Sequence, residues 1–183
     1  MKKITLLFLF TIAIGSIFSS CKKEDFGSIE VTSEQLIFNI DSIPLAGPYE
    51  KKSIGKWDVD EFAAQNKIDL KKGAKEFKFE SCKMVITEGN LKFGDFKYIQ
   101  VKVTADGLTA KDMIQRFDIP AGADKEININ NMPNVNFVEY AQAGDVTMEL
   151  FTETTRNSVP KGVIRAYPKV KVFDTKQWVS LFK

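Results

Sequence analysis

The 183-residue sequence contains no histidine, and this absence excludes much of enzyme chemistry. Without an imidazole the usual Ser-His and Cys-His catalytic arrangements and all His-ligated metal sites are ruled out. Two cysteines are too few for a zinc knuckle or a disulfide framework. The sequence also has no GK[ST] phosphate loop and no G-x-S-x-G nucleophile turn. We therefore expect a protein that is not an enzyme and that holds no metal and no cofactor.

A strong excess of charge of one sign is also missing once the N-terminus is set aside. Removal of residues 1–20 takes away Lys2 and Lys3 and no acidic residue, which leaves 24 basic and 24 acidic residues. A neutral chain has no field to steer nucleic acid, so we expect no nucleic-acid partner. The lysines between positions 51 and 78 alternate with acidic residues and are interpreted as a solvated face.

What is present begins with an N-terminal segment that has the pattern of a secretory signal peptide. Lys2 and Lys3 precede an uncharged stretch, 4–18, with the sequence ITLLFLFTIAIGSIF. As a helix this stretch would be about 22 Å long, short of the hydrocarbon core of about 30 Å. The small residues Ser19 and Ser20 follow it. The pattern predicts a cleaved signal peptide over residues 1–20 rather than a membrane span.

Cys21 directly follows Phe18, Ser19 and Ser20, and this arrangement resembles the lipobox of bacterial lipoproteins. In that class the cysteine receives lipid and becomes the mature N-terminus, with Leu commoner than Phe at the first position. A lipidated cysteine that carries several acyl chains anchors a protein stably. The resemblance implies that Cys21 is lipidated and that the membrane is a partner through this anchor. The alternative is an ordinary cleaved signal with a chance cysteine.

We expect residues 21–28 to comprise the lipidated cysteine and a polar tether. The sequence after Cys21, Lys-Lys-Glu-Asp at 22–25, resembles the charged tag of lipoproteins of the Bacteroidota, which marks export to the outer face of the outer membrane. The alternative is a solvated spacer that keeps the domain off the lipid. With the first interpretation, the protein is an outer-membrane lipoprotein that faces the outside of the cell.

Alternation of apolar and polar residues predicts short strands along the rest of the chain. The predicted strands are 29–31, 36–40, 77–87, 96–104, 126–129, 146–152 and 163–173, and the first two of these are either separate strands or one strand with a break at 32–34. The apolar parity changes within 77–87, so we expect a bulge near Ser81. Pro168 in the last strand predicts an edge strand or a bulge. Cys82, alone in an apolar strand, is interpreted as a small buried hydrophobe.

Two short helices complete the expected elements. Asp58 can cap a helix, with Glu61 as the capping-box partner three residues later. A helical turn is expected within 136–142, and 109–117 is left open between a helical turn and a loop. This composition predicts a mainly β fold: a single antiparallel two-sheet sandwich over residues 29–183, immunoglobulin-like or jelly-roll-like, with one or two short helices.

The order of elements from 58 to 173 resembles a group of uncharacterised Bacteroidota lipoproteins, with segments such as DVDEFAAQNKI, EFKFESCKMVIT and VIRAYPKVKVF. That resemblance implies an immunoglobulin-like or jelly-roll sandwich. The resemblance implies no catalytic residues for this chain.

Three side chains are candidates for modification or ligand contact. Trp57 and Trp178 could stack on a sugar face; the alternative is that Trp57 plugs one end of the sandwich and Trp178 docks the C-terminal tail. Asp41-Ser42-Ile43 resembles the short Bacteroidota O-glycosylation motif, which makes Ser42 a candidate acceptor.

The sequence therefore predicts a non-catalytic, lipid-anchored β-sandwich that serves in binding or in envelope assembly. The alternative is a surface glycan-binding accessory protein of a nutrient-uptake system, and a third interpretation is a small hydrolase. Exposed aromatics in a concave patch favour the glycan function, and a bare sheet edge favours assembly by strand addition. A cleft with two close acids, one with a raised pKa, favours the hydrolase.

Overall fold

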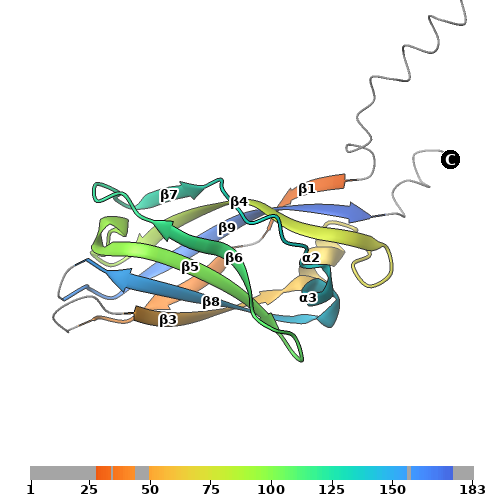
Figure 1. Ribbon diagram of the computed structural model, residues 1–183, viewed down its shortest axis with the longest axis horizontal. Coiled ribbons are helices and arrows are strands. Elements are labelled where there is room, and N and C mark those ends of the chain that lie inside the picture. Colours follow the sequence, from red (N-terminus) through yellow and green to blue (C-terminus); the bar gives the residue numbers. More distant parts are fainter. Residues whose placement is uncertain (1–27, 34, 44–49, 156–157, 175–183) are drawn as a thin grey trace, which may run out of the picture.

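The computed structural model describes residues 28–33, 35–43, 50–155 and 158–174 (Figure 1). Within these residues the chain forms nine strands, two α-helices and one short 3-10 helix. The strands are β1 (Ser28–Thr32), β2 (Leu36–Ile40), β3 (Glu50–Asp58), β4 (Ala74–Glu88), β5 (Phe96–Ala105), β6 (Lys111–Asp118), β7 (Glu126–Ile129), β8 (Asp145–Thr154) and β9 (Gly162–Asp174). The helices are α2 (Val59–Gln65), α3 (Val138–Ala143) and η1 (Phe93–Asp95).

The strands form two antiparallel sheets, which confirms the predicted two-sheet sandwich. One sheet has five strands in the order β1-β9-β4-β7, with β2 also paired to β9; the other has four in the order β3-β8-β5-β6. The two sheets lie face to face in Figure 1. The core between them is built by the inward-facing residues of both sheets, as alternation requires.

The connectivity is that of a jelly roll. β1 and β2 pair with β9, β3 with β8, β4 with β7, and β5 with β6, so the first strands pair with the last and the middle strands with each other. β1 and β2 occupy successive stretches of the same edge of β9 and together act as one strand with a break. Eight strands paired in this way, rolled into two sheets, are the jelly-roll arrangement.

Pro168 predicted an edge strand or a bulge; β9 has neighbours on both sides, so the first alternative is wrong, and the register of β4 against β9 shifts beside the Cys82–Pro168 pair. The Pro168 carbonyl accepts a hydrogen bond from Ser33 N at 2.8 Å. The nitrogen of Pro168 points to the same side as its carbonyl, toward the break between β1 and β2. The missing N–H therefore costs the ladder no hydrogen bond. The predicted bulge near Ser81 is confirmed, because the register of β4 against β9 shifts between Phe79 and Ser81.

Two strands differ from the sequence prediction. The segment left open between a helical turn and a loop, 109–117, largely forms β6, whose register against β5 is interrupted near Val101. Met113 and Ile114 are consecutive and both buried, so β6 lacks clean alternation. β3 was not predicted, because two of its inward positions are Ser53 and Gly55, which give little apolar signal.

Aromatic side chains fill one end of the sandwich beneath α2 and α3. Asp58 caps α2 as predicted and accepts from Glu61 N at 2.8 Å. Asn136 fixes the start of α3: its Oδ1 accepts from Phe77 N and Val138 N, both at 3.0 Å. The aromatic cluster between these elements has neighbouring ring centroids 5.1 to 6.1 Å apart and comprises Trp57, Phe62, Phe77, Phe79, Phe137 and Tyr140. Neither α2 nor α3, nor any other helix among the described residues, has the length and apolar character needed to cross a membrane.

The sandwich has two distinct ends. Ser28 pairs with Phe173, and Ala74 with Asp174, so the first and last described residues lie at the end that carries α2 and α3 (Figure 1). We call this the helix end. At the opposite end, the loop end, Gly94 N donates to Ala123 O at 2.8 Å and Ile43 forms a bridge with Val159.

Candidate functional site

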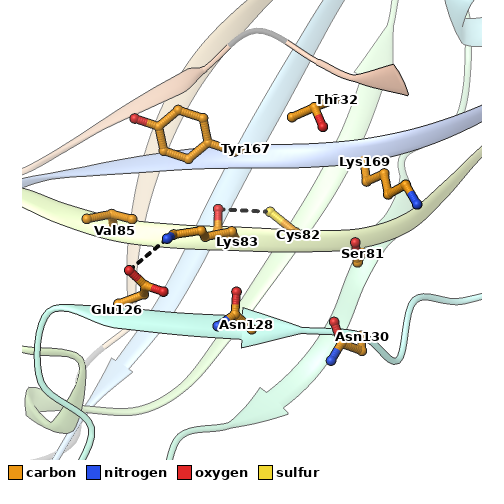
Figure 2. Close-up of a pocket in the computed structure, with 10 residues that line it drawn as sticks. All are labelled: Thr32, Ser81, Cys82, Lys83, Val85, Glu126, Asn128, Asn130, Tyr167 and Lys169. Carbon is orange, nitrogen blue, oxygen red and sulfur yellow. Dashed lines mark hydrogen bonds and ion pairs between the residues drawn. The ribbon is translucent and has the colours of Figure 1, made fainter. Parts of the chain in front are cut away.

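A hollow of about 610 Å³ lies on the outer face of the five-stranded sheet (Figure 2). It crosses four strands, with Tyr167 on the β9 side and Asn128 on β7. We call it the Tyr167 hollow. Its lining consists of Thr32, Ser81, Cys82, Lys83, Val85, Glu126, Asn128, Asn130, Tyr167 and Lys169.

Strand register places these side chains in rows across the sheet. Lys83 stands opposite Asn128 on one side and opposite Tyr167 on the other, which makes the central row. Met84, the next residue along β4, stands opposite Ile127 and Ala166. Because side chains alternate between faces, the Met84 row faces the core and the Lys83 row faces outward. A polar surface thus lies directly behind an apolar one on the same three strands.

The two lysines of the hollow are both paired with carboxylates. Lys83 Nζ lies 2.8 Å from Glu126 Oε2, and Lys169 Nζ forms an ion pair with Glu30 of β1. The hydrogen bond from Lys83 lowers the pKa of Glu126, with the Asn128 side chain contributing, and the hydrogen bond from Lys169 lowers the pKa of Glu30. The same contact with Glu30 raises the pKa of Lys169. The hollow therefore has charged groups but no unbalanced charge.

Cys82 is the one thiol among the residues that line the hollow. Its side chain is 1% exposed, and burial raises the pKa of the thiol to about 12. A thiol with this pKa is protonated at neutral pH and is a poor nucleophile. Among the described residues, no group of three or more Cys, Asp or Glu side chains is placed to hold a metal ion.

Trp57 is placed in the core, and this corrects its candidacy as a stacking residue. The side chain is 6% exposed, and its ring lies 5.3 Å from that of Phe62, 5.5 Å from Phe77 and 5.9 Å from Phe79. Its faces are covered by protein because β3 turns it inward beneath α2. This is the position that the alternative interpretation gave it, as a plug at one end of the sandwich.

Of the remaining candidate residues, only Ser42 lies within the described part of the chain. Ser42 is exposed, directly before the bridge between Ile43 and Val159 at the loop end, and its glycosylation stays a prediction. Cys21 and Trp178 lie outside the described residues, as do the signal peptide and most of the tether.

No residue of the Tyr167 hollow was a candidate for ligand contact in the sequence; Ser81 was predicted only to mark a bulge and Cys82 only to be buried. Tyr167 lies in the predicted strand 163–173 and Asn128 in the predicted strand 126–129, and Asn130 directly follows that strand. The outward parity of Tyr167 was the signal that could have found it. The proximity of Tyr167 to Asn128 was not visible, because it depends on β4 lying between β9 and β7.

No protein-family model and no curated protein sequence matches the chain. Solved structures with a similar fold include the BFDV capsid protein, with 10% identity, a TM-score of 0.36, and coverage of 79% of this chain and 97% of that one. The VP2 subviral particle of infectious bursal disease virus has 8% identity and a TM-score of 0.37, with 86% of this chain and 35% of the VP2 chain covered.

A low affinity xylan-binding module, CBM86, from Roseburia intestinalis is also similar, with 12% identity, a TM-score of 0.31, and coverage of 82% of this chain and 98% of that one. These likenesses are compatible with a β-sandwich.

Proposed function

We propose that the chain is a non-catalytic, lipid-anchored binding module of the bacterial outer membrane, held by Cys21 and facing the outside of the cell. The lipobox resemblance at Cys21 and the charged tag at 22–25 support the anchor and the compartment. The geometry adds an orientation. Seven residues lead from Cys21 to Ser28, at most about 25 Å of extended chain, and Ser28 lies at the helix end. The helix end then faces the membrane and the loop end faces away.

The edges of the two sheets are poorly suited to binding by strand addition. A partner strand needs an open, regular edge. The edge strand β7 has four residues, and the edge made by β1 and β2 is broken between them. β6 is irregular in register. β3 is approached by β2, since Ser53 Oγ donates to Asn39 O at 2.7 Å. Binding through a sheet face is therefore the better supported mode.

The observation that carries the binding function is the Tyr167 hollow. It is an open depression on a sheet face, lined by amides, hydroxyls, one tyrosine and the paired charges of Lys83, Glu126 and Lys169. The two carboxyl groups at its charge pairs, Glu30 and Glu126, both have lowered pKa values, the opposite of what a general acid needs. These features support a binding site over the hydrolase interpretation.

The anchor is tested by fractionating cells that express the full-length protein or its Cys21→Ala variant. Wild type is expected in the outer-membrane fraction, and the variant should be released because it has no thiol to lipidate. Cys82→Ala is the matched control: it removes the other cysteine and should stay in the membrane. Retention of Cys21→Ala in the membrane fraction would overturn the lipid anchor.

The outward orientation is tested by protease shaving of intact cells, with permeabilised cells as the control. Loss of the domain from intact cells is expected. Protection until permeabilisation would place the domain in the periplasm and would leave the charged tag as a spacer.

A further inference from the structure

We propose that the Tyr167 hollow is a carbohydrate-binding site for an uncharged polysaccharide, with the Tyr167 ring stacking on a sugar and the amides and hydroxyls around it bonding the sugar hydroxyls. This inference rests on the proposed binding function and names the site and the ligand class. Three features of the hollow support this ligand class: its charge balance, its hydrogen-bonding groups and the placement of its one aromatic ring.

The charge balance selects against an anionic ligand. Lys83 and Lys169 are the cations of the hollow, and each already has a carboxylate partner in Glu126 and Glu30. An anion that bonds to either ammonium group would lie beside the carboxylate partner of that lysine and would be repelled by it. A ligand without charge leaves both ion pairs intact. Phosphorylated, sulfated and uronic-acid ligands are therefore disfavoured.

The hydrogen-bonding groups suit a ligand that is rich in hydroxyls. Within the part of the chain that the structure describes, the side chains of Ser81 and Asn130 make no hydrogen bond, and the same holds for the hydroxyl of Tyr167. An amide offers both a donor and an acceptor, and a hydroxyl does so too. Sugar hydroxyls have the same dual character. These groups can therefore pair with a sugar in more than one orientation of its hydroxyls.

The aromatic ring supplies the apolar part of the site. Tyr167 is half-buried on β9, and Figure 2 shows its ring on the opposite side of the hollow from Asn128 and Asn130. A ring face carries partial negative charge and attracts the C–H face of a sugar, while the phenol end stays polar. Val85 is the only other apolar side chain of the outer face in the lining, which is too little for a lipid or for a hydrophobic peptide anchor.

The experiment is affinity electrophoresis of the full-length protein in detergent, in native gels that contain one polysaccharide each. The uncharged probes are xylan, glucomannan, hydroxyethylcellulose and dextran, and the acidic probe is polygalacturonate. We expect at least one uncharged probe to retard the protein and polygalacturonate to have no effect. Tyr167→Ala should weaken binding to the retarding probe about tenfold, because a stacked ring contributes about 1.4 kcal/mol.

Controls separate a lost contact from a lost fold. Phe151→Ala removes a half-buried ring from the outer face of the other sheet and should leave retardation unchanged. Tyr167→Phe keeps the ring and should retain most of the binding, and each variant's thermal unfolding is measured alongside. The site is overturned if no uncharged probe retards the protein, or if folded Tyr167→Ala binds like wild type. Such a failure leaves the Cys21→Ala fractionation, and hence the anchor, unaffected.

A charge change makes a second, independent test. Glu126→Gln removes the carboxylate that pairs with Lys83 while keeping its size, so the hollow gains one unbalanced positive charge. We expect this variant to gain retardation by polygalacturonate that disappears at high salt. If wild type already binds polygalacturonate and no uncharged probe, the ligand class is wrong.

Discussion

The five-stranded sheet uses its two faces in opposite ways. On the inner face, Phe77 and Phe79 of β4 are packed among other aromatic rings and are almost fully buried. On the outer face of the neighbouring strand, Tyr167 stands beside amides and paired charges. The place of an aromatic residue in the pleat, more than its type, therefore decides whether it stabilises the fold or is available to a ligand. Phe77→Ala and Lys83→Met test the two faces directly, and Gly89→Ala and Asp58→Ala, with intermediate expected effects, test the two ends of the sandwich.

Phe77→Ala should have the largest effect on stability. Phe77 is 0% exposed, and its ring lies 5.5 Å from Trp57, 5.7 Å from Phe79 and 6.1 Å from Phe62. The cavity left by the ring should lower the free energy of unfolding by about 3–5 kcal/mol. Denaturant titration measures the change. Tyr167→Ala on the outer face is the control and should cost clearly less; equal losses would contradict the division between the two faces.

Gly89→Ala tests a close approach at the loop end. Gly89 has φ +79°, and a Cβ there would lie 2.3 Å from the Lys161 carbonyl oxygen. The left-handed backbone and the contact together should cost about 1–3 kcal/mol. Gly107→Ala is the matched control, because Gly107 has φ +71° but nothing within 4 Å of the added Cβ. The difference between the two melting temperatures isolates the contact, and no difference would argue against it.

Asp58→Ala should remove the N-cap of α2, the helix above the aromatic cluster. The Asp58 carboxylate accepts from Glu61 N at 2.8 Å, and loss of such a cap costs about 1 kcal/mol. Asp58→Asn keeps an acceptor and should retain most of the stability. Asp60→Ala removes an exposed acid from the same turn and serves as the control for charge. If it destabilises as much as Asp58→Ala, the cap is not the cause.

The ion pair in the Tyr167 hollow should give the smallest effect on stability and a clear effect on titration. The pKa of Glu126 is lowered by Lys83, so the pair's contribution is present above the usual glutamate pKa of about 4.3 and is lost as pH falls through the lowered value. Carboxyl NMR should show the Glu126 pKa returning toward its usual range in Lys83→Met. Glu30, which is paired with Lys169, should keep its lowered pKa in the same variant. An unchanged Glu126 pKa in Lys83→Met would show that Lys83 is not the cause of the lowered value.

Most strands could be predicted from the sequence because each has one face in the core, which leaves an alternation of apolar and polar residues along it. The helix cap at Asp58 and the bulge at Ser81 were visible as a spacing and as a change of parity. β3 and β6 were missed because they lack this alternation. Gly55 in β3 has no side chain, and Met113 and Ile114 in β6 are consecutive and both buried. The position of Pro168 in a central strand could not be predicted, because β9 accommodates a proline there only where the paired edge is broken between β1 and β2.

The site could not be predicted in the same way. Asn128, Lys83 and Tyr167 meet only because β7, β4 and β9 are neighbours, and nothing local in the sequence states that order. The two tryptophans drew attention as large aromatics, yet Trp57 is part of the core. The aromatic residue of the hollow is Tyr167, which faces outward on the central strand β9. Its neighbours across the sheet could be known only from the order of the strands.

The pairing of the first strand with the last also bears on when the molecule can fold. β1 and β2 have no partner until residues 162–174 are available, and β3 must wait for β8. Chains dominated by such distant pairings fold slowly, in milliseconds to seconds, because the cost of closing long loops comes before the gain in contacts. A chain interrupted anywhere before its last strand has a five-stranded sheet without its central member. The nascent protein is therefore expected to stay unfolded until its C-terminal strand has been made, which is the state in which a polypeptide can be threaded through a membrane channel.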